Sequence, residues 1–330
     1  MNSTLLPVAV DAMGGDRGPG EIVRGARRAV EELGVPVVLV GRPDELGDTG
    51  GLEVIAASEV IAMDADPGTS VRRMKDSSLV RAAEAVRDRR ASAMVSAGNT
   101  GATMGSALLR MGRCKGVRRP AIATPIPVPG ATPTVLLDAG ANIECQPEWL
   151  VQFAQMGAVF ARARYQIEVP RVGLLSIGEE PTKGTPLVKA THDLLAEGAW
   201  ADTCDATFVG NIEGRDLMTG AADVAVTDGF TGNVALKALE GGMRTLIDAL
   251  YGVFDASDEN RAAAEVLLPA LAPLAAQLDP DSTGGAMLLG VDGVCIISHG
   301  SSSADAVVNA VGVAVAMVAA DVVGRIAASV

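Results

Sequence analysis

The stretch MVSAGNTGA, from Met94 to Ala102, shows the pattern that decides the fold. A short, continuously apolar run ends in a loop of Gly, Asn and Thr, and such a run is typical of a strand that is buried on both faces. Comparable runs recur along the chain, most of them separated by enough residues for a helix. We expect these further strands at residues 8–10, 37–40, 121–125, 135–138, 172–177, 207–210, 224–227 and 294–298.

Helical patterns lie between these strands. They cover residues 20–33, 77–90, 147–163, 186–196 and 232–251. The alternation predicts a three-layer α/β/α sandwich around a mostly parallel, doubly wound sheet. Residues 243–279 break it with an apolar helical pattern, interrupted at Pro269 and Pro273, which predicts a helical excursion. Without a linker or repeat to divide the chain, we expect residues 1–330 to form a single α/β unit.

Composition narrows the possible functions. Hydrophobic residues make up 48% of the 330 residues and charged residues 20%, which indicates a folded globular protein. The only histidines are His192 and His299, and the four cysteines never form a CxxC pair, so we expect no metal site, redox dithiol or other cofactor. The N-terminus lacks the features of a signal peptide, and residues 306–320 are too short an apolar stretch to span a bilayer. The sequence therefore predicts a cytoplasmic protein.

Polar, glycine-rich loops follow most of the predicted strands. They cover residues 11–16, 96–102, 138–142, 178–184, 210–216 and 227–233. Each alone is an ordinary turn, but the carboxyl ends of parallel strands meet at one edge of a sheet, so we expect the loops to form a common rim. Gly amides, helix N-termini and neutral Asn and Thr donors suit phosphate. No Walker, GxGxxG or GxSxG signature occurs, and no third group is evident to orient a Cys295–His299 pair, so covalent catalysis is not predicted.

Seven motifs resemble those of the bacterial acyl-ACP:phosphate acyltransferases in order and spacing. They are DAMGGD, SAGNTGA, LDAGAN, GEEPTKG, GNIEGRD, TDGFTGNVALK and SHGSSSADAV. The resemblance implies transfer of a long-chain acyl group from acyl carrier protein to inorganic phosphate, giving an acyl phosphate for phospholipid synthesis. It also implies a fold similar to isopropylmalate dehydrogenases and phosphotransacetylases. Ser176, where the family often has Asn, and Thr185-Pro186, in place of a common Asn-Glu, are departures beside Lys183.

The same resemblance implies a homodimer that associates peripherally with the membrane surface. There a membrane acyltransferase uses the acyl phosphate to acylate glycerol 3-phosphate. The excursion's apolar residues suit membrane contact, but packing in a core or dimer explains them equally well.

The implied reaction needs positioning more than strong acids or bases, because phosphate is itself an anionic nucleophile. We predict that Lys183 pairs with phosphate and neutralises the developing oxyanion, with Asn211 and Asn233 as further catalytic donors. Asp11, Asp138 and Asp228 are expected mainly to organise their loops, because like charges repel. The predicted phosphate-binding residues are Gly98, Asn99, Thr100, Gly101, Asn142, Asp228, Gly232 and His299. Of these, His299 either orients a polar group at the rim or has a structural role.

The net charge of −13 is unevenly distributed, since residues 72–119 carry 12 Lys and Arg against 3 Asp and Glu. Acyl carrier protein is strongly acidic, so this basic segment is a predicted docking surface, although a solvated basic face is the simpler explanation. The acidic balance and 3% aromatic content argue against nucleic acid. The predicted docking residues are Arg72, Arg73, Lys75, Arg110, Arg113, Lys115, Arg118 and Arg119.

Three alternatives remain open at this point. A phosphotransacetylase-like enzyme using short acyl-CoA would share the reaction logic. A dehydrogenase of the same fold would need a dinucleotide site and a carboxylate cluster for a divalent metal, which the sequence does not supply. A non-catalytic, phosphate-binding regulatory or scaffold protein at the membrane would need only the rim of loops.

Overall fold

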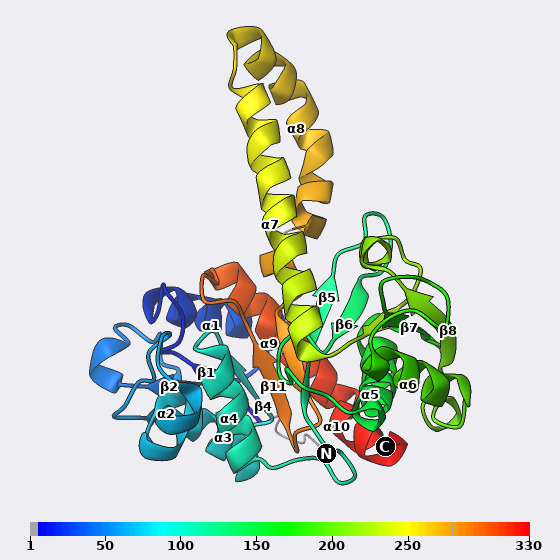
Figure 1. Ribbon diagram of the computed structural model, residues 1–330. Coiled ribbons are helices and arrows are strands. Elements are labelled where there is room, and N and C mark those ends of the chain that lie inside the picture. Colours follow the sequence, from blue (N-terminus) through cyan, green and yellow to red (C-terminus); the bar gives the residue numbers. More distant parts are fainter. Residues whose placement is uncertain (1–5, 279) are drawn as a thin grey trace.

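One sheet of eleven strands forms the centre of the computed structural model, which describes residues 6–278 and 280–330 (Figure 1). The strands lie in the order β3-β2-β1-β4-β11-β10-β5-β6-β9-β7-β8. Their bounds are β1 Val8–Asp11, β2 Val37–Gly41, β3 Glu53–Ala56, β4 Ala93–Ser96, β5 Ala121–Ile126, β6 Thr134–Leu137, β7 Arg171–Leu175, β8 Thr207–Ile212, β9 Val224–Val226, β10 Ala286–Leu289 and β11 Val294–Ile297.

Helices cover both faces of this sheet. Their bounds are α1 Gly20–Leu33, α2 Pro67–Arg73, α3 Ser78–Arg87, α4 Thr100–Arg110, α5 Pro147–Tyr165, α6 Pro186–Ala196, α7 Gly229–Phe254, α8 Asp258–Leu278, α9 Ala304–Ala319 and α10 Val322–Ser329. The predicted α/β/α sandwich is confirmed, and the bounds predicted for α1 and α6 agree with those observed. Strands β3 and β10 and helices α2, α4 and α10 were not predicted.

Strand direction reverses within the sheet. Among the described strand pairs, β10–β11, β10–β5 and β5–β6 are antiparallel and the other seven are parallel. Strands β1 to β4 and β11 therefore end at one edge of the sheet, whereas β6 to β9 end at the opposite edge. The sheet is mostly parallel as predicted, and the reversal does not keep all the polar loops apart. Ala139 after β6 and Asn233 of the helix after β9 line the same cavity as Thr100 after β4 and His299 after β11, whereas the loops after β7 and β8 do not contribute to that cavity. The antiparallel strand β10 and the turn between β5 and β6 cause the reversal.

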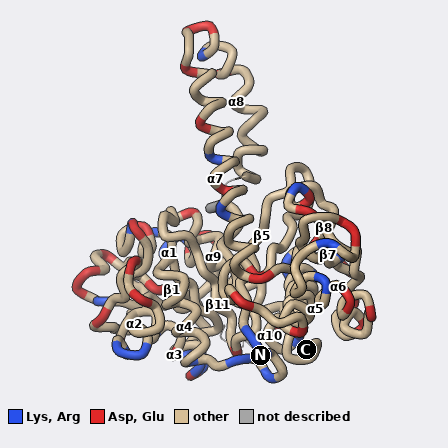
Figure 2. The backbone as a smooth tube through the Cα atoms, in the orientation of Figure 1, with Lys and Arg blue, Asp and Glu red and all other residues tan. Residues whose placement is uncertain are grey.

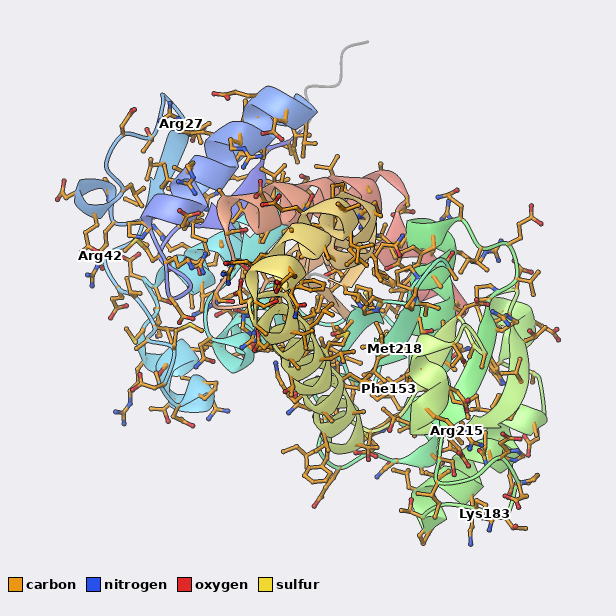
Figure 3. The ribbon with its side chains drawn as sticks, turned by 90° about the horizontal axis from the view of Figure 1, so that it is seen from above. Arg27, Arg42, Phe153, Lys183, Arg215 and Met218 are labelled. Atoms are coloured by element: carbon orange, nitrogen blue, oxygen red, sulfur yellow. The ribbon has the colours of Figure 1, made fainter. Side chains whose placement is uncertain are left out.

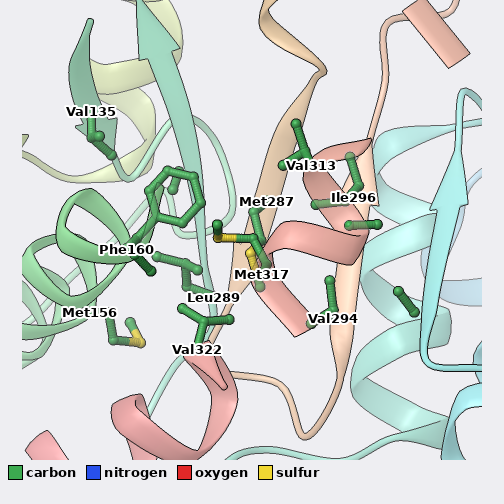
Figure 4. Packing of buried hydrophobic residues seen from close by; sticks show 14 of the residues in the cluster. Val135, Met156, Phe160, Met287, Leu289, Val294, Ile296, Val313, Met317 and Val322 are labelled. Atoms are coloured by element: carbon green, nitrogen blue, oxygen red, sulfur yellow. The ribbon is translucent and has the colours of Figure 1, made fainter. Parts of the chain in front are cut away.

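Alternation along the strands divides the core into two apolar clusters. Val8 and Val10 of β1 face one cluster and Ala9 faces the other, as the two-residue period of a strand requires. The first cluster packs α1, α5, α9 and α10 against the sheet, and Figure 4 shows Met317 of α9 beside Met287 of β10. The second packs α2 to α4 and the base of α7 on the other face. Both faces of the central strands are thus removed from water, which explains their continuous apolar runs.

Helices α7 and α8 form a hairpin that projects from the body (Figure 1). With 26 residues, α7 is about 39 Å long at 1.5 Å per residue, and only its first turns pack on the sheet. The predicted helical excursion is confirmed here, although α8 continues through Pro269 and Pro273 instead of breaking at them. Residue 279, the last of the predicted excursion, lies outside the described residues, as do residues 1–5 of the predicted unit.

The hairpin leaves many large apolar side chains in contact with solvent. Leu246 is 72% exposed and Val266 78%, and Tyr251, Val253 and Leu267 are each at least half exposed. An apolar surface of this kind marks a site of contact with another molecule.

In the described part of the chain, no single helix has the length and apolar character needed to cross a bilayer. Helices α9 and α10 meet that criterion only as a pair, with a bend of 54° between them.

Candidate active site

A cavity of about 180 Å³ lies where three helices begin, beside the carboxyl ends of β4 and β11. Thr100 of α4, Asn233 of α7 and His299 after β11 all line it, so three of the predicted site residues meet here. Lys237 lines it as well. The floor is formed by side chains of β5 and by the residues that begin β10. The cavity therefore lies on the second face of the sheet, under the base of α7.

The N-terminus of α4 contributes backbone donors to this cavity. The first amides of a helix have no acceptor within the helix. Asn99 caps α4, because its Oδ1 accepts from the Ala102 amide at 2.9 Å and its carbonyl oxygen accepts from the Thr103 amide at 2.9 Å. The amides of Thr100 and Gly101 remain for an anion, which the positive end of the helix dipole also favours.

Asn99 and Gly98 do not act as predicted. The Asn99 side-chain nitrogen donates to the carbonyl oxygens of Met63 at 2.8 Å and Ala65 at 3.1 Å, so this side chain holds a neighbouring loop in place. The Gly98 amide donates to Ser96 Oγ at 2.9 Å. The predicted phosphate contacts of Asn99 and Gly98 are therefore replaced by contacts that build the loop.

His299 faces the cavity with a defined tautomer. The Ser301 amide donates to His299 Nδ1 at 3.2 Å, and Ser301 Oγ lies 2.7 Å from the same nitrogen. Because Nδ1 accepts a hydrogen bond, the proton of the neutral ring belongs on Nε2, which becomes a donor. The neighbouring Ser298 Oγ is buried and, within the described residues, has no hydrogen-bond partner. A buried hydroxyl of this kind lining a cavity suits a ligand acceptor.

One face of α7 carries the polar groups of the opposite wall. Asn233, Lys237 and Glu240 are spaced four and three residues apart, which places them on the same side of the helix. Lys237 Nζ lies 2.8 Å from Glu240 Oε2, and the Lys237 side chain is 53% exposed. An ion pair this exposed contributes little to stability, so the ammonium group can turn toward a bound anion at small cost. Lys237 was not predicted as a site residue, although it ends the motif TDGFTGNVALK.

Asp228 and Gly232 position α7. Asp228 caps the helix by accepting from the Thr231 amide at 2.9 Å and the Thr231 hydroxyl at 2.8 Å. A Cβ on Gly232 would lie 2.0 Å from the Asp138 carbonyl oxygen, so only glycine allows α7 to approach so closely. The prediction that Asp228 organises its loop is confirmed, whereas its contact with phosphate stays a prediction.

The loop after β6 is held by the buried carboxylate of Asp138. This carboxylate accepts backbone hydrogen bonds from Ile122, Gly140, Ala141 and Asn142 at 2.7–3.1 Å. Burial raises the pKa of Asp138, and these hydrogen bonds oppose the shift. The Asn142 side-chain nitrogen donates to the Pro120 carbonyl oxygen at 2.8 Å and to Asp138 at 2.9 Å. Asn142 is therefore part of the loop framework, not the phosphate ligand that was predicted.

Asp11 has the corresponding role after β1. Its carboxylate accepts from Ser96 Oγ at 2.7 Å and from the Met13 amide at 3.2 Å. Burial raises the pKa of Asp11. The loop-organising roles predicted for Asp11 and Asp138 are confirmed.

Lys183 and Asn211 lie away from this cavity. They belong to the loop after β7 and to β8, whose carboxyl ends are at the opposite edge of the sheet, and Figure 3 shows Lys183 at the outer margin of the molecule. Lys183 is exposed, and the Asn211 side-chain nitrogen donates to the Glu180 carbonyl oxygen at 2.9 Å. Within one copy of the chain, the structure does not bring them together with Asn233 and His299. Their catalytic roles stay predictions from sequence.

The predicted docking residues occupy two stretches, the end of α2 and the segment from the end of α4 to β5. The second stretch lies on the side of the body away from the hairpin (Figure 2). All of them are exposed except Arg110, which is half-buried with its Nε 3.7 Å from Glu84. Arg119 lies over the Trp149 ring at 4.7 Å, and Arg113 donates to the Arg118 carbonyl oxygen at 2.6 Å. Several of these side chains thus also have partners within the chain, and docking stays a prediction.

The chain has an α/β fold with a cavity at helix N-termini, a position that favours an anion. Solved structures with the same fold include a phosphotransacetylase from Streptococcus pyogenes, with a TM-score of 0.65, 19% identity and coverage of 95% of this chain and 94% of that one. The EutD phosphotransacetylase from Staphylococcus aureus gives a TM-score of 0.61 at 15% identity, covering 94% of each chain. At these identities the likeness establishes the fold.

Sequence comparison then identifies the family. Residues 6–325 match the family model described as "Fatty acid synthesis protein". The chain is 49% identical over 318 residues to the phosphate acyltransferase of Elusimicrobium minutum, covering 93% of this chain and 90% of that protein. It is 47% identical over 319 residues to that of Heliobacterium modesticaldum, with coverage of 94% and 93%. The chain belongs to this family of fatty acid synthesis proteins and is an acyltransferase, which confirms the resemblance found in the motifs.

Proposed function

We propose that this protein transfers a long-chain fatty acyl group from acyl carrier protein to inorganic phosphate, giving an acyl phosphate. The observation that carries the proposal is the cavity under α7. Lys237, the His299 ring and the N-terminus of α4 converge there without a fixed nucleophile. The phosphate acyltransferase names of the relatives support orthophosphate as the acceptor.

In this proposal phosphate binds between α4 and α7. It accepts from the backbone amides of Thr100 and Gly101, from His299 Nε2 and from the Ser298 hydroxyl. Lys237 leaves Glu240 and pairs with the dianion, which a compact ammonium group can do without a fixed geometry. Asn233, whose Cβ lies against Gly140, adds a neutral donor on the side of α7.

The reaction then needs no covalent enzyme intermediate. A phosphate oxygen attacks the thioester carbonyl carbon, forming a C–O bond and moving the carbonyl electron pair onto oxygen. The C–S bond breaks as the carbonyl re-forms, and the thiolate of the carrier leaves with the electron pair. A thiol with a pKa of about 8.5 is a good leaving group, so positioning and oxyanion stabilisation are the main contributions of the protein.

Delivery of the substrate fits the geometry of α4. Thr100 lines the cavity at the start of this helix, and Arg110 lies at its end, about 16 Å away for 11 residues. An acidic carrier bound to the arginines at that end would reach the cavity with a flexible thiol arm laid along the helix. The remaining docking residues extend the same basic surface.

The hairpin supplies the proposed contact with a homodimer partner and with the membrane surface. Its exposed apolar side chains include Leu246, Tyr251, Val253, Val266 and Leu267. Such a location would release acyl phosphate on the cytoplasmic side, near a membrane enzyme that acylates glycerol 3-phosphate. Flotation with liposomes tests this part, because Leu246→Glu should abolish flotation if that side chain inserts and should leave it unchanged if the contact is elsewhere.

The direct test of the proposed function uses the whole protein with palmitoyl carrier protein and phosphate. We expect free thiol to appear in step with a hydroxylamine-sensitive acyl product, and neither should appear when phosphate is omitted. Acetyl-CoA serves as the second donor. Turnover of acetyl-CoA alone would contradict a long-chain donor, and no turnover of either donor would contradict the activity itself.

A further inference from the structure

A second, smaller cavity of about 50 Å³ lies against the first, on the side of the hairpin. Thr124, Leu236, Glu240 and Thr283 line both cavities. Because the same side chains bound both spaces, the two adjoin. A group extending from the first cavity toward the hairpin enters the second.

The second cavity differs from the first in its lining. Residues 125–127 at the end of β5 supply two prolines and Ile126, which is 1% exposed. Leu239 and Met243 of α7 and Leu278 at the end of α8 complete the wall. Apart from Thr124, Glu240 and Thr283 on the wall shared with the first cavity, the lining is apolar, so the end away from that wall suits a hydrocarbon.

Helix α7 connects the polar and apolar parts along one side. Asn233 and Lys237 lie at the first cavity, and Leu236, Leu239 and Met243 follow at spacings of three and four residues. From Asn233 to Met243 the helix rises about 15 Å. One helix face therefore changes from hydrogen-bonding to apolar over the length of an extended alkyl chain.

We propose that the second cavity receives the alkyl chain of the acyl donor, and that Met243 and Leu278 at its far end set the preferred chain length. This inference rests on the proposed function. When the thioester carbonyl carbon lies beside phosphate, its sulfur must remain on the side of the carrier, and its alkyl substituent leaves on another side. The apolar cavity adjoins the site of that carbon, so the chain passes from the reacting centre into a space that excludes water.

The small size of the cavity agrees with a role for Met243 as a movable stop. Methionine has three rotatable bonds and fills irregular gaps, so its side chain can yield to an entering chain. Each additional methylene that becomes buried strengthens binding about fourfold. Chains that reach past Met243 gain only if its side chain moves into the seam between α7 and α8.

The experiment compares acyl donors of different length on the same carrier protein, so that carrier docking is constant. Octanoyl, decanoyl, lauroyl and palmitoyl donors are assayed with the wild type, with Met243→Ala and with Met243→Phe. We expect Met243→Ala to raise the ratio of kcat/KM for palmitoyl over decanoyl by about 15-fold, equivalent to two more buried methylenes, and Met243→Phe to lower it. Leu33→Ala, at a 42%-exposed leucine at the end of α1, is the matched control and should leave the ratio unchanged.

The outcomes separate this inference from the proposed function. If the wild type turns over none of the donors, the proposed function fails, and the inference fails with it. If the wild type is active and both Met243 variants keep its chain-length ratio, the alkyl site is wrong while the function stands. Should Met243→Phe not fold, a photoreactive diazirine at the end of a fatty acyl donor provides a second measurement on the wild type. Labelling of Leu239, Met243 or Leu278 supports the site, and labelling confined to other residues overturns it.

Discussion

Replacing Lys237 by alanine is the perturbation that the structure makes most informative. In the free protein Lys237 Nζ pairs with Glu240 at 2.8 Å, and the Lys237 side chain is 53% exposed. An exposed pair of this kind is worth at most about 1 kcal/mol, so the variant should fold with nearly the same free energy of unfolding. In the proposed reaction, however, the ammonium group would pair with the phosphate dianion. Further negative charge would develop on the carbonyl oxygen of the thioester as phosphate attacks.

The expected loss follows from one charge-assisted hydrogen bond. Such a bond contributes about 1.5–3 kcal/mol, which corresponds to a fall of about 10- to 150-fold in kcat/KM for phosphate. Phosphate is varied at a fixed concentration of palmitoyl carrier protein, and thiol release is followed. Lys189→Ala is the matched control, since Lys189 is an exposed lysine on α6 that has no proposed role in the site, and Lys183→Ala is measured as the alternative predicted from sequence.

We expect Lys189→Ala to change kcat/KM for phosphate by less than about threefold. The reasoning is refuted if Lys237→Ala retains the wild-type kcat/KM, or if Lys183→Ala loses more of it than Lys237→Ala does. The second result would instead support the role predicted for Lys183 from sequence.

Three further predictions concern packing, thiols and docking. Gly232→Ala should lower the free energy of unfolding by about 1–3 kcal/mol or more, because its Cβ would overlap a carbonyl oxygen. Gly241→Ala, which has open space around it in α7, should raise the free energy of unfolding by about 0.5–1 kcal/mol. Thermal unfolding measures both variants, and equal effects would contradict the close approach of α7. Burial raises the pKa of Cys295 to about 12, so its thiolate is scarce from pH 7 to 9. Iodoacetamide should therefore leave the activity intact. Rapid inactivation that follows labelling of this thiol would be inconsistent with its burial. The double variant Arg113→Glu, Arg118→Glu should raise the KM for acyl carrier protein and make that KM less dependent on salt. The KM for phosphate should not change. A KM for the carrier that stays at the wild-type value would argue against docking at these arginines.

Much of the fold could be predicted because the central strands and amphipathic helices obey their local rules. Helix α1 begins after Pro19 and ends at Gly34 in the left-handed conformation, so its observed bounds agree with those predicted. Strand β3 escaped because it lies at the edge of the sheet and is only partly buried, and therefore lacks the continuously apolar run. Strand β10 was not predicted because it is four residues long and follows the excursion directly.

Strand β10 was not predicted, and it is antiparallel to both of its neighbours. The directions of the strands beyond it were therefore not predicted either. A loop sequence shows which residues are polar, but the edge at which it lies depends on strand direction, which is a property of the whole sheet. Lys183 and Asn211 follow or belong to strands that run opposite to β4 and β11, and neither lines the cavity that Thr100 and His299 share. Asn99 and Asn142 illustrate a second reason: loop asparagines bind neighbouring backbone as readily as a ligand, and composition does not distinguish the two.

Lys237 could have been found from the sequence. It lies four residues after Asn233, one helical turn along a predicted helix, and therefore shares its face. Considering which residues of the helix predicted at residues 232–251 share the face of Asn233 would have placed a cation at the cavity.

The central claim is that orthophosphate binds between the N-terminus of α4 and the first turns of α7. The most direct measurement is a crystal structure of the protein soaked in tungstate, a phosphate analogue that its anomalous signal locates without ambiguity. The account predicts the anion within hydrogen-bonding distance of the Thr100 amide and of His299 Nε2, with Lys237 turned toward it. An anion bound instead beside Lys183 and Asn211, with the cavity under α7 empty, would contradict it.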